Sequence, residues 1–386
     1  MLPSNVPSES ISRMMPIAVR AQTDIGKEHH TNEDSFAIQN VGDDILLVVC
    51  DGMGGMGRGD EASTLGVDTI LDVVNGATPD DPSERLIEAI QLADLAIRHA
   101  LCVGLQGRPG CTAVSIMLRD GKGHVAWVGD SRVYLVRDGT IVQRTRDHKL
   151  VEDLVEAGEL TPEEAKVSAL SSVLTRALGG RKPDGKRLEV AVLDNPWEMQ
   201  PGDWIVLCSD GLCDLVPDDE LPELLEYSSP EEACKNLVQV ALDRGGHDNI
   251  TVICAEWQSP ETLELVDCVD NRSHRTPVSD EAQARANAAI KGPAPDDSTD
   301  PFAPKRKEWP GDDAAAKTNT PAPPTPHFTG GGNERAAPAA AAPPAGPIFL
   351  GIALLGLLTW GVVNQLRSAA SSNAAPSTTE EMAVKP

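Results

Sequence analysis

Four aspartates stand where a short apolar stretch of the chain ends or begins: Asp51, Asp130, Asp210 and Asp248. These stretches are typical of strands, so each carboxylate is expected at a strand end. Carboxylates on the ends of neighbouring central strands suit a hard cation, because Mg²⁺ and Mn²⁺ take oxygen ligands. One such aspartate alone is more often part of a turn. The four together, with Asn32-Glu33-Asp34 besides, favour a metal site.

The stretch from Ile45 to Ser63 combines all the parts of such a site. Its first six residues are apolar and rich in β-branched side chains, which predicts a strand buried on both faces. Asp51 ends this strand, and the glycines that follow let main-chain atoms approach a ligand closely. The acidic pair Asp60-Glu61 then begins a helix, where the helix dipole favours negative charge.

Period-two and helical patterns alternate along residues 17–257. Strands are expected at 17–22, 36–39, 111–118, 124–128, 132–136, 140–144, 188–193, 203–208 and 249–257, and helices at 62–75, 82–102, 149–177 and 230–243. Asp81 is a plausible helix cap, and Asp120-Gly121 and Asp138-Gly139 predict hairpin turns. Because the strands come in meanders and the helices cluster apart, we expect packed antiparallel sheets with helices outside them.

The composition excludes one large class of partner and suggests a compartment. The net charge is −26 and the isoelectric point is about 4.6, which argues against nucleic acid, since phosphates need basic patches. The eight cysteines form no C-x-x-C pair, so they are expected to be buried thiols in a reducing compartment. The N-terminus is polar, without an apolar signal segment, so we expect the globular part in the cytoplasm.

The chain changes character after residue 258. Residues 1–16 are a polar leader and residues 17–258 are globular. Residues 259–346 carry too little apolar surface to offset the entropy of ordering, so a disordered linker is expected.

Residues 347–363 are uncharged and would form a helix about 25 Å long, the short end of what crosses a bilayer. The alternative, a buried core helix, has no neighbouring core. We expect a single-pass anchor in the inner membrane, followed by a tail, 364–386.

Seven short motifs occur in order along the chain: Asn32-Glu33-Asp34, Asp51-Gly52-Met53-Gly54-Gly55, Gly110-Cys111-Thr112, Gly129-Asp130-Ser131-Arg132, Thr145-Arg146-Asp147-His148, Ser209-Asp210-Gly211 and Asp248-Asn249. The ordered set resembles that of the type 2C metal-dependent serine/threonine protein phosphatases of bacterial type. The resemblance implies an α+β fold, with a central antiparallel β-sandwich flanked by helices on both sides in four layers, α-β-β-α. It also implies two Mn²⁺ or Mg²⁺ ions at one edge of the sandwich.

The resemblance implies a role for most of the acidic residues. Asp51 would bridge both metals, and Asp210 and Asp248 would complete the shell of the first. The carbonyl of Gly52 would serve the second metal. Its waters would be held by Glu33 and Asp34.

Other residues near these motifs receive further roles from the resemblance. Asp130 and Asp214 match positions that bind a third, weaker metal in similar enzymes. His148 and His247 lie beside carboxylates but are expected either to be structural or to support the metal ligands without binding metal, because the family's site is all oxygen. Residues 150–172 correspond to a variable flap near the substrate groove.

Two departures from the family pattern concern catalysis. The position of the phosphate-binding arginine is occupied by His29, which would hold a dianion less firmly unless it is protonated. Lys27 or Arg20 could substitute for it, or His29 could be an ordinary loop residue. Met53 stands where eukaryotic relatives carry a proposed general-acid histidine, as is common in bacterial members.

The resemblance predicts an enzyme. A water activated by two cations would attack phosphorus in line, without a phosphoenzyme. Phosphoserine and phosphothreonine proteins, the products of a serine/threonine kinase, would be its substrates. The alternative hypothesis is a pseudo-phosphatase that binds phosphoproteins with little turnover because of His29.

Overall fold

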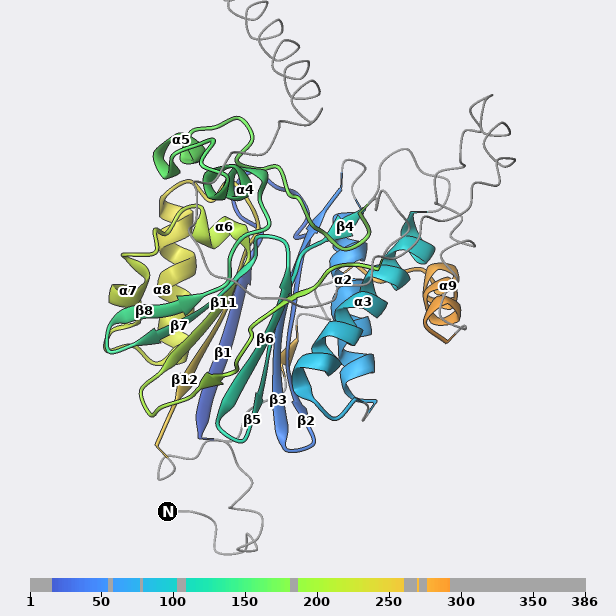
Figure 1. Ribbon diagram of the computed structural model, residues 1–386, viewed down its shortest axis with the longest axis horizontal. Helices are drawn as coiled ribbons and strands as arrows, with labels where there is room; N and C mark the ends of the chain where they lie inside the picture. Colours follow the sequence, from blue (N-terminus) through green and yellow to red (C-terminus); the bar gives the residue numbers. More distant parts are fainter. Residues whose placement is uncertain are drawn as a thin grey trace, which may run out of the picture. The chain divides into compact units, whose positions relative to one another are not determined.

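Two antiparallel sheets pack face to face, and helices cover both outer faces (Figure 1). The computed structural model describes residues 16–54, 58–76, 79–102, 109–180, 187–259, 269–270 and 276–291. The first sheet has the order β1 (Ile17–Asp24), β12 (Ile250–Trp257), β11 (Trp204–Cys208), β7 (Arg132–Arg137), β8 (Thr140–Arg144). The second has the order β10 (Trp197–Glu198), β6 (Lys122–Val128), β5 (Ala113–Arg119), β3 (Asp44–Met53), β2 (Asp34–Val41), β13 (Val269–Asp270), with β4 (Gly110–Cys111) beside β3 and β9 (Ala191–Val192) beside β6.

Strand β3 is buried on both faces, as its sequence predicts. Its even-numbered side chains, Leu46, Val48 and Cys50, belong to the core beneath the helices. Its odd-numbered side chains, from Ile45 to Val49, belong to the core between the two sheets. The strand thus joins two cores, and it holds Asp51 at a rigid position at its end.

The helices form the outer layers that the four-layer prediction requires. Helices α2 (Gly59–Val74) and α3 (Pro82–Leu101) cover the second sheet. Helices α6 (Asp210–Cys213), α7 (Leu221–Leu225) and α8 (Pro230–Asp243) contribute to the core on the outer face of the first. The predicted α+β architecture is confirmed in the described part of the chain.

Local sequence signals also act as predicted. The Asp81 side chain accepts a hydrogen bond from the Glu84 amide at 2.9 Å and so caps α3. Both residues of the turns Asp120-Gly121 and Asp138-Gly139 have positive φ, which a tight hairpin turn requires. The seven cysteines that the structure describes are all buried free thiols, also as predicted.

The prediction of helix across residues 149–177 is largely wrong. Only α4 (Leu150–Glu156) and α5 (Pro162–Lys166) form, and residues 167–176 follow an irregular path. Few apolar side chains there find a core, and Val167 is 86% exposed. A helix without a buried face lacks the packing that stabilises most short helices. The strand expected at 188–193 is likewise reduced to β9.

The expectation of disorder from residue 259 is wrong for two described segments. Strand β13 pairs with β2, and helix α9 (Asp280–Lys291) packs on α3. Ala282 and Ala286 lie one helical turn apart on α9 and are fully buried, so a small apolar face suffices for docking. Thr276 donates a hydrogen bond to the Asp60 carboxylate at the start of α2.

The remaining predictions on the termini concern residues outside the described ranges. These are the leader up to residue 15, the apolar segment 347–363 and the tail 364–386. None of the helices in the described part of the chain combines the length and apolar character that a bilayer crossing requires.

His148 fixes the turn that carries Asp130. The Gly129 amide donates to His148 Nδ1 at 3.0 Å, and the His148 amide donates to the Gly129 carbonyl at 2.9 Å. The imidazole also stacks on Trp127, with ring centroids 6.0 Å apart. His148 is therefore structural, as predicted. Burial, with the nearby Arg176 guanidinium, lowers the pKa of His148 to about 4.

This low pKa makes the fold sensitive to acid. The folded-state pKa lies below the unfolded value of about 6.5, so only the unfolded chain takes up this proton between these values. The stability contribution of a neutral His148 is present above pH 6.5 and is lost as the pH falls towards 4. The free energy of unfolding of the wild type should fall between pH 7 and pH 4. We predict that this fall is smaller by roughly 1–3 kcal/mol in His148→Asn, which keeps an acceptor for the Gly129 amide.

Urea unfolding of metal-free protein at both pH values measures this difference. His30→Asn, which changes an exposed side chain, is the control. An identical pH dependence in wild type and His148→Asn would contradict the prediction.

Candidate active site

Asp51 and Asp34 face each other across neighbouring strands. Asp51 near the end of β3 is the register partner of Asp34, the first residue of β2. Hydrogen bonds also hold the backbone of Asp51 to Thr112: the Asp51 amide donates to Thr112 Oγ1 at 3.0 Å, and the Thr112 amide donates to the Asp51 carbonyl at 2.8 Å. The two carboxylates thus come from rigid, paired strands.

Ser209 joins the two sheets at this end. Its hydroxyl donates to Asp34 Oδ2 at 2.7 Å and accepts from the Thr251 amide at 3.0 Å. Asp34 belongs to the second sheet, whereas Ser209 and Thr251 follow or lie in strands of the first. Ser209 and Asp34 are both buried, so this hydrogen bond fixes one sheet edge against the other.

Asn249 performs the same task for Glu33. Its side-chain oxygen accepts from the Glu33 amide at 2.7 Å, while its side-chain nitrogen donates to the carbonyls of Ile25 and Thr31. Asn249 directly precedes β12 and is buried. It therefore positions the loop before β2 beside Asp248, its neighbour in the chain.

Two glycines allow the backbone to close around these acids. A Cβ on Gly52 would lie 2.2 Å from the Gly59 carbonyl oxygen, and a Cβ on Gly211 would lie 2.1 Å from the Asn249 carbonyl oxygen. Only glycine fits at such approaches. The sequence indicated this freedom for Gly52.

The pKa values show that several carboxyls share one buried region. Burial, with repulsion from neighbouring carboxylates, raises the pKa of Asp34 to about 7 and that of Asp210 to about 8. Burial, followed by Asp210 and Asp34, raises the pKa of Asp51 well above its usual value. Asp248 contributes to each of these shifts. The acids predicted from separate motifs therefore lie within electrostatic reach of one another.

A divalent cation fits the chemistry of this cluster. Asp210 Oδ1 is buried and has no hydrogen-bond partner among the described residues, and such an atom needs a cation or a donor. The neighbouring groups are oxygen donors of like charge, which hard cations bind. As they stand, no three His, Cys, Asp or Glu side chains of the described residues are arranged to hold one metal ion. Binding would have to draw these carboxylates together.

Asp130 and Asp214 already share a cation of the protein. Lys149 Nζ lies 2.9 Å from Asp130 Oδ2 and 3.5 Å from Asp214 Oδ1. Burial alone would lower the pKa of Lys149, but these carboxylates outweigh burial and raise it. The sequence analysis did not single out Lys149, although it follows the Thr145–His148 motif directly.

His29 lies at the acidic cluster, and its proposed substitutes do not. His29 Nε2 is 3.4 Å from Asp248 Oδ1, and both side chains are partly exposed. Lys27 donates a hydrogen bond to the Leu242 carbonyl near the end of α8. Arg20 in β1 interacts electrostatically with Glu231 of the same helix. Of the three candidates for a phosphate contact, only His29 is placed to make one.

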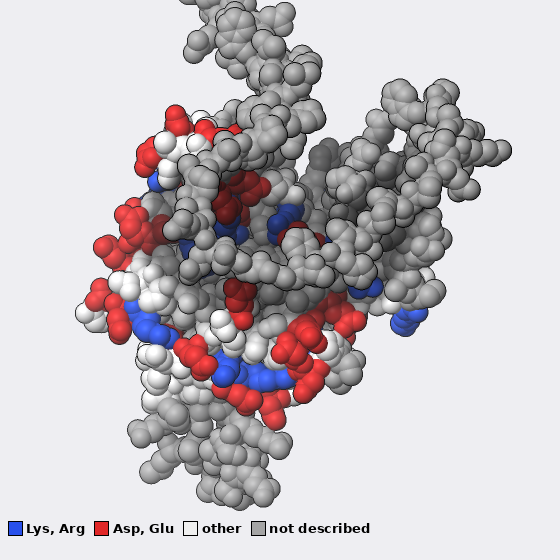
Figure 2. All heavy atoms as spheres, viewed as in Figure 1, with Lys and Arg blue, Asp and Glu red and all other residues white. Residues whose placement is uncertain are grey.

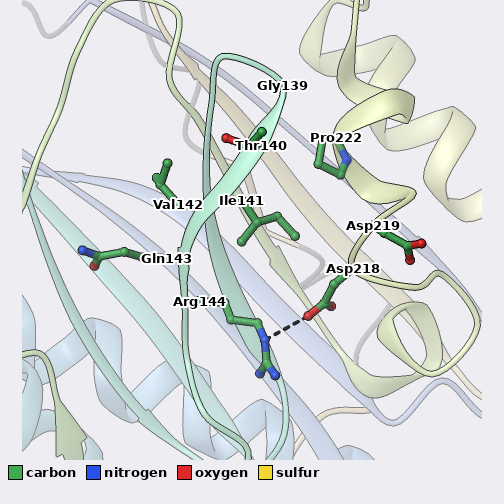
Figure 3. A pocket seen from close by; sticks show the side chains of 9 residues that line it. All are labelled: Gly139, Thr140, Ile141, Val142, Gln143, Arg144, Asp218, Asp219 and Pro222. Atoms are coloured by element: carbon green, nitrogen blue, oxygen red, sulfur yellow. Dashed lines mark ion pairs between the residues drawn. The ribbon is translucent and has the colours of Figure 1, made fainter.

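The groove shown in Figure 3 is separate from the acids. Its volume is about 540 Å³, and it follows the edge strand β8 beside Asp218, which pairs with Arg144 at 2.9 Å. None of the predicted metal ligands lines it. Acidic side chains outnumber basic ones on the face seen in Figure 2, in agreement with the net charge of −26.

The sequence analysis gave no role to four residues that contact the candidate site residues: Thr112, Lys149, Ser209 and Asn249. Thr112, Ser209 and Asn249 lie within the quoted motifs, so their positions were visible. Their partners lie up to 216 residues away along the chain, and only the fold shows them.

Comparison with known proteins agrees with this geometry. The family model described as Protein phosphatase 2C matches residues 19–250. The serine/threonine protein phosphatase PstP of Mycobacterium tuberculosis is 34% identical over 241 residues, which are 61% of this chain and 44% of PstP. The chain thus spans less than half of that relative. The serine/threonine phosphatase stp of Listeria welshimeri is 32% identical over 61% of this chain and 94% of its own length.

Solved structures show the same fold. A crystal structure of M. tuberculosis PstP/Ppp superposes with a TM-score of 0.56 at 32% identity, covering 63% of this chain and 99% of that chain. The PstP catalytic domain in complex with two manganese ions gives a TM-score of 0.54 at 31% identity, over 63% and 99%. The chain therefore belongs to the protein phosphatase 2C family and contains a serine/threonine phosphatase domain of that family.

Proposed function

We propose that this protein hydrolyses phosphoserine and phosphothreonine in other proteins with the help of two Mn²⁺ or Mg²⁺ ions. The observation that carries the proposal is the buried group of carboxyls with raised pKa values, in which Asp210 Oδ1 has no hydrogen-bond partner among the described residues. A group of this kind is stable in its ionised form only when cations neutralise it. The manganese complex of PstP supports the choice of metal.

The proposed ligands are those that the family resemblance implies for these acids. Asp51 would contact both ions, Asp210 and Asp248 the first, and the Gly52 carbonyl the second. Glu33 and Asp34 would hold water molecules of the second ion. When bound, the two ions would supply a hydroxide at neutral pH and offset the charge of the phosphoryl oxygens.

The chain's own residues would orient this chemistry. Ser209 keeps Asp34 in one orientation through its short hydrogen bond, and Thr112 fixes the backbone of Asp51. Asn249 holds the loop that carries Glu33. His29, beside Asp248 and partly exposed, would contact the incoming phosphate from the solvent side when protonated.

We also propose that residues 347–363 anchor the chain in the inner membrane, with the phosphatase domain in the cytoplasm. The uncharged, apolar sequence of this segment supports the proposal. Proteins phosphorylated by a serine/threonine kinase would be the substrates. If the full chain and a chain ending at Gly346 both stay in the soluble fraction after cell lysis, the anchor is refuted.

A second candidate function, binding of phosphoproteins with little turnover, rests on His29 alone. An imidazole offers fewer donors to a phosphate than the planar fork of a guanidinium. The complete acidic set counts against this candidate. Turnover and phosphopeptide affinity measured on one sample distinguish the two.

Removal of the metal ligands tests the proposed function. We predict that Asp210→Asn lowers the Mn²⁺-dependent hydrolysis of p-nitrophenyl phosphate and of a phosphothreonine peptide by at least about 100-fold. EDTA should abolish both activities, and added Mn²⁺ should restore them. Asp138→Asn, in an exposed turn that tolerates asparagine, is the matched control. A rate that is unchanged by EDTA would refute the mechanism.

Replacement of His29 tests its contact with the phosphate. We predict that His29→Arg raises kcat/KM for the phosphopeptide by about tenfold and that His29→Ala lowers it, because arginine can bind the dianion through two hydrogen bonds. Steady-state kinetics at pH 7.5 measure both effects. His30→Arg, which adds the same charge one residue away, controls for simple electrostatic attraction. Equal rates for His29→Arg and His30→Arg would exclude a specific contact.

A further inference from the structure

The pair of carboxylates assigned by resemblance to a third metal has a different occupant in this protein. The Lys149 ammonium lies within hydrogen-bond distance of Asp130 Oδ2, at 2.9 Å, and 3.5 Å from Asp214 Oδ1. The Lys149 side chain is only 10% exposed and that of Asp130 only 5%. We propose that Lys149 is the resident cation of this pair and takes the place of a third divalent ion. The proposal rests on the proposed function only in calling this ion the third, because that function supplies the first two.

The ammonium is held in place by the backbone at the base of the flap. Lys149 is the N-cap residue of α4 and has an extended conformation, and it forms an isolated β-bridge with Leu174. The neighbouring Leu150 amide donates to the Val173 carbonyl at 2.8 Å. These contacts fix the backbone from which the Lys149 side chain reaches Asp130.

The backbone at each of the two aspartates is held by other parts of the fold. Asp130 follows Gly129, whose amide and carbonyl are both hydrogen-bonded to His148. Asp214 ends the short helix α6, where its amide donates to the Asp210 carbonyl at 2.8 Å. Lys149 therefore connects the flap, the Gly129-Asp130 turn and the helix that begins with Asp210.

Charge decides between the ammonium and a divalent ion. The same carboxylate oxygens cannot hold both at short distance without strong repulsion between the two cations, because a partly buried position offers little screening. An ammonium is also a point charge with three donors, which suits two carboxylates from different elements. A third metal therefore does not fit while Lys149 is present.

Counting bound ions tests the proposal. The full-length wild type, Lys149→Ala and Lys149→Met are titrated with Mn²⁺, and bound ions per chain are counted by electron paramagnetic resonance and calorimetry. Each neutral variant should bind one ion more than wild type. The dissociation constant of this extra ion should be roughly millimolar or lower, and at least about tenfold lower than that of any further ion bound by wild type. Lys149→Arg, which keeps the charge, should match wild type. Lys166→Ala in α5 controls for loss of an exposed lysine.

A second measurement covers variants that fold poorly without metal. Lys149→Met keeps most of the apolar stem of the side chain. Without divalent ions its Tm should be lower than that of wild type. Millimolar Mg²⁺ should raise the Tm of Lys149→Met by more than it raises the Tm of wild type. Equal ion counts and equal Mg²⁺ responses in wild type and the neutral variants would overturn the proposal. Absence of Mn²⁺ binding in wild type would count against the proposed function instead, because the Lys149 inference concerns only the difference between the variants.

Discussion

The burial of several carboxyls in one region, where they also repel one another, is the constraint on which the rest of this structure depends. Asp34, Asp51 and Asp210 lie at or beside the ends of strands from both sheets, and burial, followed by repulsion from neighbouring carboxylates, raises the pKa of each. Such a group is unfavourable in the metal-free protein. It persists because the strands that carry it are anchored in cores far larger than the site.

Neutral hydrogen bonds hold the carboxylates in position without removing their charge. Ser209 links Asp34 to the opposite sheet, and Asn249 ties the Glu33 loop to the start of β12. Each of these polar side chains satisfies several backbone groups at once, so neither is left unpaired in the interior. The carboxylates are therefore held in place, but their negative charge is not neutralised, and Mn²⁺ or Mg²⁺ would neutralise it.

Two basic side chains, Lys149 and His29, pair with different members of this acidic group. Lys149 pairs with Asp130 and Asp214 at the base of the flap. His29 lies beside Asp248 where solvent and substrate can reach it. The Lys149 ammonium is thus the more buried of the two groups, and the His29 imidazole is the more exposed. Such an arrangement would separate the structural role of positive charge from its role in binding phosphate.

The sequence by itself determined the features that depend on neighbouring residues. The double burial of β3, the Asp81 cap, the hairpin turns and α8 follow from local periodicity and turn chemistry, and the ordered motifs were enough to identify the family and its acidic positions. Tertiary structure alone decided the features that depend on distant residues. Residues 167–176 were predicted to be helical but form no helix, because their apolar side chains have no core to pack against. Helix α9 forms because Ala282 and Ala286 are buried where α9 packs on α3. The Lys149 ion pairs and the Ser209 bridge are likewise contacts between separate elements, and residue spacing along one chain contains no information on which elements meet.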